Sequence, residues 1–267
     1  MPFILLSHQR SMSSFLMNIL RTHPKIRMLN EPLGQHIELF REVDLYTIRD
    51  VDFKLWTMEN SYNFYEINNY IEELICWSNN NQFYGFKEVL FLNKIEWILK
   101  RFPKYKIIIL FRNPMGTIEA LYRRNLDIRW NFNALVLNYY KKTNSLPIEI
   151  NLNNRIHICS IVWKLRVAPA LKILSQPIHS NLLCILSEDI VNNFEKTLSL
   201  VCNYIGVETH QSQLNYAKEC WAYHRGGLFS DYRKKEYFYD WKYRLSKEDI
   251  RDIEHITGEE MEKLGYL

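Results

Sequence analysis

The chain has 267 residues, of which 47% are hydrophobic and 14% aromatic, and its formal net charge is +4. A chain of this length and composition can bury a substantial core, and we expect a single α/β domain over residues 1–267. Lys and Arg are interleaved with Asp and Glu along the chain, which favours a local pocket for an anionic ligand over a nucleic-acid track.

Elements of two kinds alternate along the chain. Residues 2–6 form a short apolar run typical of a buried strand, and a polar turn and apolar residues at helical spacing follow it. Residues 83–90, 106–111 and 181–186 are three further candidate strands, and each precedes an amphipathic helical pattern. This alternation predicts a parallel sheet with helices on both faces.

Two segments interrupt the alternation. Residues 44–69 and 125–154 are rich in Asn, Tyr and Trp with weak periodicity, and we expect them to form caps over the carboxyl edge of the sheet. Residues 222–242 are basic and aromatic and predict a long loop. A last helix is expected at residues 246–264, where a capping-box pattern begins it.

Cysteine usage and the N-terminus bear on location. The five cysteines are scattered and form no CxxC pair, so neither a disulfide framework nor a zinc site is indicated. The N-terminal apolar run has no basic region before it and no cleavage site after it, and no long apolar span occurs elsewhere. We therefore expect a cytoplasmic protein that binds neither membrane nor nucleic acid.

The turn after the first strand has the features of an anion cradle. It reads Ser7-His8-Gln9-Arg10-Ser11-Met12-Ser13-Ser14 and leads directly into a helix. Backbone N–H groups at a helix N-terminus, aided by hydroxyls and a cation, bind phosphate or sulfate. The turn lacks the glycines and the lysine of a Walker A loop, which argues against an ATP or GTP hydrolase. The simpler alternative is a serine-rich helix cap, and His8 is expected to be structural or a rim contact.

This turn resembles the 5'-phosphosulfate loop of sulfotransferases that use 3'-phosphoadenosine 5'-phosphosulfate (PAPS). The family loop has an Arg or Lys, then Ser, Gly and two hydroxyl residues, and Met12 stands here in place of the glycine. The resemblance implies the P-loop-like parallel sheet of the sulfotransferase fold. It implies that Arg10 contacts the 5'-phosphosulfate and that Phe15 lies near the adenine. The cofactor residues implied for this loop are Arg10, Ser11, Met12, Ser13, Ser14 and Phe15.

A second loop, Arg112-Asn113-Pro114, resembles the family's 3'-phosphate signature. The family usually has a serine eight positions after the arginine, and Ala120 occupies that position here. Arg124 matches a further arginine of the tyrosylprotein branch, so the resemblance implies that Arg112 and Arg124 grip the 3'-phosphate, which guanidinium groups can do bidentately. The alternative is a strand-end arginine paired with a surface carboxylate.

Segments in the last third of the chain resemble the family as well. Residues 186–190 are similar to a Tyr-Glu-Asp-Leu segment, with Ser187 at the place of a tyrosine that contacts adenine. The basic residues Arg233 and Lys234 resemble the loop that reaches the 3'-phosphate, and residues 225–227 (Arg-Gly-Gly) compete for that role.

Sulfuryl transfer needs a base for the acceptor's proton and a cation for the departing phosphate oxygen. By likeness to tyrosylprotein and some bacterial carbohydrate sulfotransferases, Glu31 is the candidate base. His36 is the alternative, since cytosolic members of the family use histidine. Lys87 corresponds to a lysine that assists the leaving group in the tyrosylprotein branch. The simpler alternatives are an exposed loop glutamate for Glu31 and an ion pair with Glu88 for Lys87.

The expected reaction is direct in-line transfer from PAPS to a hydroxyl or amine of a small polar acceptor, such as a natural product, an alkaloid or a sugar. No acidic cluster lies next to either loop in the sequence, so we expect no metal. The two expected caps are long enough to close a small pocket, and their Glu59, Glu66 and Asp127 would favour a hydroxylated or cationic acceptor.

Two other functions compete with this interpretation. One is a nucleotide-dependent kinase of related fold, which the missing Walker residues disfavour. The other is a PAPS-binding module without activity, which the departures from the family pattern at Met12, Ala120 and Ser187 suggest.

Overall fold

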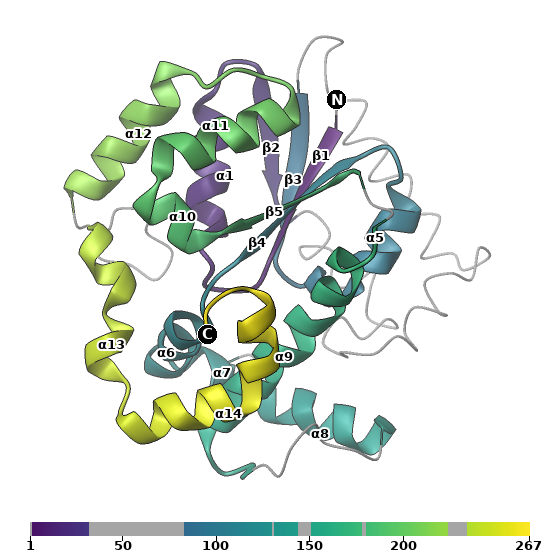
Figure 1. The fold of residues 1–267 in the computed structure, drawn as a ribbon, viewed down its shortest axis with the longest axis vertical. Helices are drawn as coiled ribbons and strands as arrows, with labels where there is room; N and C mark the ends of the chain where they lie inside the picture. The colour runs from purple at the N-terminus through teal and green to yellow at the C-terminus, as the bar shows by residue number, and fades with distance from the viewer. Residues whose placement is uncertain (1, 32–82, 130, 144–150, 178–179, 224–233) are drawn as a thin grey trace.

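The computed structural model describes residues 2–31, 83–129, 131–143, 151–177, 180–223 and 234–267. Five parallel strands form one sheet in the order β2-β3-β1-β4-β5 (Figure 1). The strands are β1 (Pro2–Ser7), β2 (Ile26–Asn30), β3 (Phe83–Glu88), β4 (Lys106–Phe111) and β5 (Leu182–Leu186). The predicted parallel sheet is confirmed, with β2 as an additional strand.

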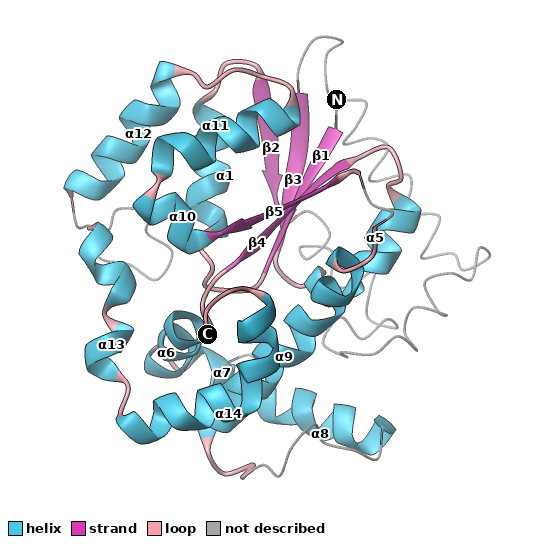
Figure 2. Ribbon diagram, viewed as in Figure 1, coloured by secondary structure: helices cyan, strands magenta, loops and turns pink. Residues whose placement is uncertain are grey.

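Helices cover both faces of the sheet (Figures 1 and 2). One face carries α1 (Ser13–Thr22), α10 (Ser187–Asn192), α11 (Phe194–Ile205) and α12 (Gln211–Ala222). The other carries the 3-10 helix η1 (Leu92–Lys94), α5 (Ile95–Arg101) and α9 (Arg155–Leu174). The result is a three-layer α/β/α arrangement.

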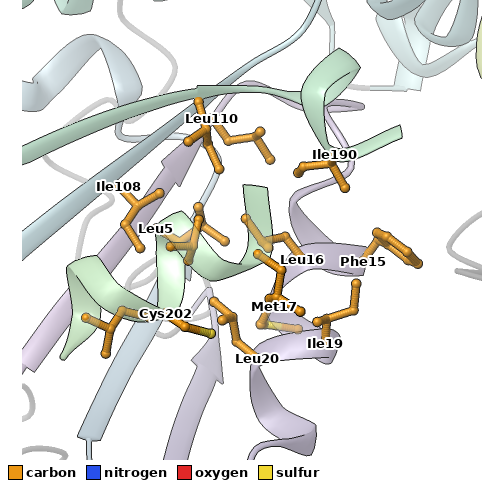
Figure 3. Packing of buried hydrophobic residues seen from close by; sticks show 14 of the residues in the cluster. Leu5, Phe15, Leu16, Met17, Ile19, Leu20, Ile108, Leu110, Ile190 and Cys202 are labelled. Carbon is orange, nitrogen blue, oxygen red and sulfur yellow. The ribbon is translucent and has the colours of Figure 1, made fainter. Parts of the chain in front are cut away.

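Alternation along the strands divides the core between these layers. Ile4 and Leu6 of β1 pack on the side of α5 and α9, whereas Phe3 and Leu5 pack on the side of α1 and α11. Figure 3 shows the second cluster, in which Leu16 of α1 lies among the sheet residues and their neighbours. Residues 3–6 of β1 and 107–111 of β4 are buried on both faces of the sheet and are all apolar.

A further group of helices packs at the carboxyl ends of the strands, around one end of α9 (Figure 1). It comprises α6 (Pro114–Arg123), α7 (Leu126–Arg129), α8 (Phe132–Thr143), α13 (Trp241–Arg244) and α14 (Lys247–Lys263). Ile253 and Ile256 of α14 join a core cluster with Ile158 and Val162 of α9. This packing places the C-terminal helix beside the loops that follow the strands.

The expected caps and the expected loop differ in their outcomes. The described part of residues 125–154 holds α7 and α8, so it is largely helical, while residues 44–69 lie outside the described ranges. The expected long loop at residues 222–242 was partly wrong, because the 3-10 helix η2 (Lys235–Tyr239) and the start of α13 lie within it. The capping box at Ser246 and Asp249, which begins α14, is confirmed.

Candidate active site

Loops that carry the candidate residues converge at the carboxyl edge of the sheet. Open α/β folds bind their ligands at this edge. β1 leads into the loop before α1, and Arg112 directly follows β4. Lys87 of β3 is aligned with Leu5 of β1 and with Asn30 of β2, so the first residue after β2, Glu31, lies next to it.

The first loop has an unusual backbone. Arg10 has φ 66° and Met12 has φ 64°, both in the left-handed region, which costs an L-residue roughly 1–2 kcal/mol. Met12 thus adopts the conformation that glycine would supply with less strain. Its side chain packs against the core cluster around Phe15 and Leu16. The loop therefore keeps a left-handed turn although the glycine is missing.

The N-terminus of α1 carries no side-chain cap among the described residues. Met12 is the N-cap residue, and the hydroxyl of the buried Ser11 donates instead to the carbonyl of His8 at 2.5 Å. The first-turn N–H groups of Ser13, Ser14 and Phe15 have no acceptor within the helix. Such N–H groups, together with the helix dipole, can bind an anion, and the anion site in this loop stays a prediction.

Two other residues of this region are buried. His8 is 1% exposed and its Nδ1 lies 2.7 Å from the carbonyl of Gln9. Burial and the nearby Arg166 guanidinium lower the pKa of His8 to about 3, which favours the neutral imidazole. Phe15 is 4% exposed and its ring centroid lies 5.4 Å from that of Trp221. Its place beside an adenine stays a prediction.

Lys87 and Glu31 form an ion pair at the same edge. Lys87 Nζ lies 2.5 Å from Glu31 Oε1 and 3.4 Å from Ser14 Oγ in the first turn of α1. The side chain of Lys87 is 2% exposed and that of Glu31 is 32% exposed. A buried ammonium needs such a partner. The structure therefore brings together the predicted base, the predicted leaving-group cation and the anion loop.

Glu31 also has a strained backbone, with φ 49°. Among the described residues other than glycine and asparagine, those with positive φ are Arg10, Met12 and Glu31. All three lie in loops at this one edge of the sheet. Such strain persists where the surroundings enforce it and tends to cluster at functional sites, which supports this edge as the active site.

Arg112 joins the second loop to two other segments. Its Nη1 donates to the carbonyl of Arg10 at 2.8 Å, and its Nη2 donates to the carbonyl of Phe238 in η2 at 3.0 Å. The guanidinium also lies over the Phe238 ring, 4.2 Å from its centroid. A Cβ on Gly116 would come within 2.7 Å of Nη2, so glycine at this position makes room for the arginine.

One face of α6 continues from Arg112. Gly116, Ala120 and Arg124 follow at spacings of four residues and so share this face. Ala120 is 6% exposed, and it occupies the position of the expected serine. Small side chains thus separate Arg112 from Arg124. Arg123 points elsewhere and pairs with Glu119 at 2.6 Å.

Glu188 makes two contacts that no sequence pattern indicated. Its Oε1 accepts the backbone N–H of Asn113 at 3.1 Å, and its Oε2 accepts the hydroxyl of Tyr266 at 2.9 Å. Burial and the Glu188 carboxylate raise the pKa of Tyr266, which keeps the phenol protonated as a donor. Glu188 therefore connects the second loop to the C-terminal end of the chain.

Several predicted residues lie elsewhere. His36 and Arg233 are outside the described ranges. Lys234 is exposed and its ammonium lies 3.7 Å from Glu236, so its role at the 3'-phosphate stays a prediction. The expectation for Asp127 was wrong, because this carboxylate is buried and paired with Arg155 at 2.6 Å.

Other features of the described residues bear on class and location. They contain no group of three or more His, Cys, Asp and Glu side chains placed to hold a metal ion. No helix in the described ranges has both the length and the apolar character needed to cross a membrane. Within the described ranges, Cys159, Cys184, Cys202 and Cys220 form no disulfide bond.

A family model described as "Sulfotransferase family" matches residues 2–211, which include both loops, Glu31 and Lys87. The chain belongs to the sulfotransferase family. No curated protein sequence matches it. Phe238 and Tyr266, which contact the second loop through Arg112 and Glu188, lie beyond the matched region of this sulfotransferase.

Solved structures of low identity share the fold of this sulfotransferase. The sulfotransferase domain from the curacin biosynthetic pathway is 19% identical with a TM-score of 0.53, covering 97% of each chain. Mouse SULT7A1 complexed with PAP is 14% identical with a TM-score of 0.54, covering 97% of this chain and 83% of that one. STF9 from Mycobacterium avium is 12% identical with a TM-score of 0.54, covering 98% and 76%.

Proposed function

We propose that this sulfotransferase moves a sulfuryl group from PAPS to a hydroxyl or amine of a small polar acceptor. The observation that carries the proposal is the meeting of two anion loops with the Glu31–Lys87 pair at one edge of the sheet. Two separate anion sites suit a nucleotide with phosphate at both the 5' and the 3' positions. The mouse relative of the same fold was solved with PAP, the desulfated form of PAPS.

Each loop has a defined task in this proposal. The uncapped N–H groups of α1, with Arg10 and the serine hydroxyls, hold the 5'-phosphosulfate. Arg112 and Arg124 hold the 3'-phosphate along the small-residue face of α6. Phe15 bounds the adenine, and Arg233 and Lys234 approach the 3'-phosphate from the segment after α12.

The transfer step follows from the ion pair. Glu31 accepts the proton of the acceptor hydroxyl or amine while the acceptor atom forms a bond to sulfur. The bond from sulfur to the 5'-phosphate oxygen breaks in line, without a covalent enzyme intermediate. Lys87, which also lies near Ser14, stabilises the charge on the departing oxygen, and PAP is released. No metal is needed in this scheme, and His36 is the alternative base.

The acceptor site lies under the cap helices in this proposal. The cap helices α7 and α8 stand at the carboxyl edge, where they can enclose a small acceptor such as a natural product, an alkaloid or a sugar. We also infer a single domain over residues 1–267, since α14 shares a core with α9. We infer a cytoplasmic location, since the cysteines of the described residues form no disulfide bond.

A turnover screen tests the proposal. Purified protein is incubated with PAPS and a panel of small hydroxyl and amine compounds, tyrosine peptides and glycans, and products are read by mass for an added sulfuryl group. We expect sulfation of small compounds that disappears in Glu31→Gln. PAP binding without any product would favour the binding module, and products formed with ATP in place of PAPS would favour the kinase.

A further inference from the structure

Ser187, in a third segment of the chain, contacts the first anion loop and the end of β4, where the second anion loop begins. It is the first residue after β5 and is 0% exposed. Its Oγ lies 2.6 Å from the carbonyl oxygen of Ser11 and 2.9 Å from that of Phe111. A hydroxyl has one hydrogen, so the two carbonyls share it in a three-centre bond.

One carbonyl belongs to the first anion loop, and the other belongs to the last residue of β4, after which the second anion loop begins. Ser11 follows Arg10 in the first loop, and Phe111 directly precedes Arg112 in the second. The ladder between β1 and β4 pairs residues up to Ser7 and Leu110. The first loop leaves the sheet beyond Ser7, whereas Phe111 still pairs with Leu186 of β5. The spacing between the first loop and the end of β4 therefore depends on contacts made outside the ladder between β1 and β4.

A second contact connects the first loop with the second loop. Arg112 Nη1 donates to the carbonyl of Arg10, the residue before Ser11. Glu188, the neighbour of Ser187, accepts the backbone N–H of Asn113. Ser187 and Glu188 thus hold the main chain on both sides of Arg112, while Arg112 itself reaches back to the first loop.

We propose that Ser187 is a positioning residue that sets the distance between the 5' and 3' anion sites. It does not touch the nucleotide; it fixes the two loops so that one molecule with two phosphates meets both. A tyrosine is usual at this position in the resembled segment, and the buried serine supplies a main-chain bridge instead. The inference rests on the proposed use of PAPS, because only a doubly phosphorylated nucleotide senses this spacing.

The experiment compares PAP with AMP, which lacks the 3'-phosphate, by calorimetry on Ser187→Ala. We expect the affinity for AMP to stay within about twofold and the PAP-to-AMP affinity ratio to fall roughly 3- to 10-fold, the scale of one buried hydrogen bond. Ser160→Ala is the matched control, since Ser160 is equally buried and its Oγ donates to Ile156 at 2.7 Å within α9. The control should keep the ratio of the wild type.

Different outcomes contradict the positioning role of Ser187 and the proposed use of PAPS. A folded Ser187→Ala with an unchanged ratio, or an equal fall in Ser160→Ala, would overturn the positioning role. Equal affinity of the wild type for PAP and AMP would remove the proposed function and this inference with it. If Ser187→Ala does not fold, Ser187→Cys, whose thiol donates only weakly, should lower the ratio in the same way, and an unchanged ratio there would also overturn the role.

Discussion

Glu31 contacts Lys87 twice, once through its side chain and once through its backbone. Its carboxylate lies 2.5 Å from Lys87 Nζ, and its backbone N–H donates to the Lys87 carbonyl at 2.8 Å. The main-chain bond fixes the first residue after β2 to β3, and the ion pair orients the side chain. In the proposed reaction the base and the leaving-group cation therefore act from one fixed unit.

Replacing the carboxylate tests the base. Glu31→Gln keeps the shape and should leave PAP affinity within about twofold, while turnover falls by roughly 10²-fold or more, the usual scale for losing a general base. Steady-state kinetics with the acceptor found in the screen, together with PAP calorimetry, measure both quantities. If Glu31→Gln stays active and His36→Ala does not, the base is His36.

Removing the ammonium tests the leaving-group role. Lys87→Met keeps most of the volume of this buried side chain and should lower turnover by roughly 10²-fold, as expected for a lost group that stabilises developing charge. Lys106→Met is the control. Lys106 is the first residue of β4, at the end of the strand away from the loops, and its Nζ donates to the Tyr204 carbonyl. Comparable losses of turnover in the two variants would argue against a specific role for Lys87.

Crowding Arg112 tests the second anion site without deleting a charge. In Gly116→Ala the new Cβ would lie 2.7 Å from Arg112 Nη2, so the guanidinium must shift, and we expect PAP affinity to fall about tenfold. Gly258→Ala is the matched helical control, since a Cβ there meets only Leu267 at 4.0 Å. The control should gain about 0.5–1 kcal/mol of stability and bind PAP as the wild type does. Unchanged PAP binding in Gly116→Ala would place the 3'-phosphate away from Arg112.

The C-terminal contact with the second loop gives a further prediction. Tyr266→Phe removes the donor to Glu188, which also holds the Asn113 N–H, and should lower the free energy of unfolding by about 1 kcal/mol. Tyr243→Phe, at a side chain that is 90% exposed, should have no measurable effect. Chemical denaturation measures both, and equal stability of the two variants would show that the contact contributes nothing.

The sequence predicted the sheet because residues 3–6 and 107–111 form short apolar runs, which are a local signal. The edge strand β2 was missed, since only Ile26 and Met28 of its five residues are buried and its pattern is too short to separate from a loop. No local pattern indicated that Glu31 and Lys87 contact each other, because their contact depends on the pairing of β2 with β3 across a long stretch of chain.

Other parts of the site depend on three-dimensional contacts that no local pattern carries. The left-handed backbone of Met12 is not a property of methionine, and it is enforced by its surroundings. From the sequence, Ser187 was only a departure from the tyrosine of the family segment. Its two main-chain contacts could not be predicted, because both partners are distant in sequence. The sequence did not indicate a role for Gly116. The need for glycine there depends on the position of the Arg112 side chain, which a Cβ would meet.

Calorimetric titration of the wild-type protein with PAP and with ATP tests the two-site account most directly. Both nucleotides carry adenine and 5'-phosphate, but only PAP carries a phosphate at the 3' position. We predict that PAP binds at least about tenfold more tightly than ATP, and that Arg112→Ala removes at least ~1.5 kcal/mol of the PAP binding energy. Equal affinity for PAP and ATP, or no loss in Arg112→Ala, would contradict the account.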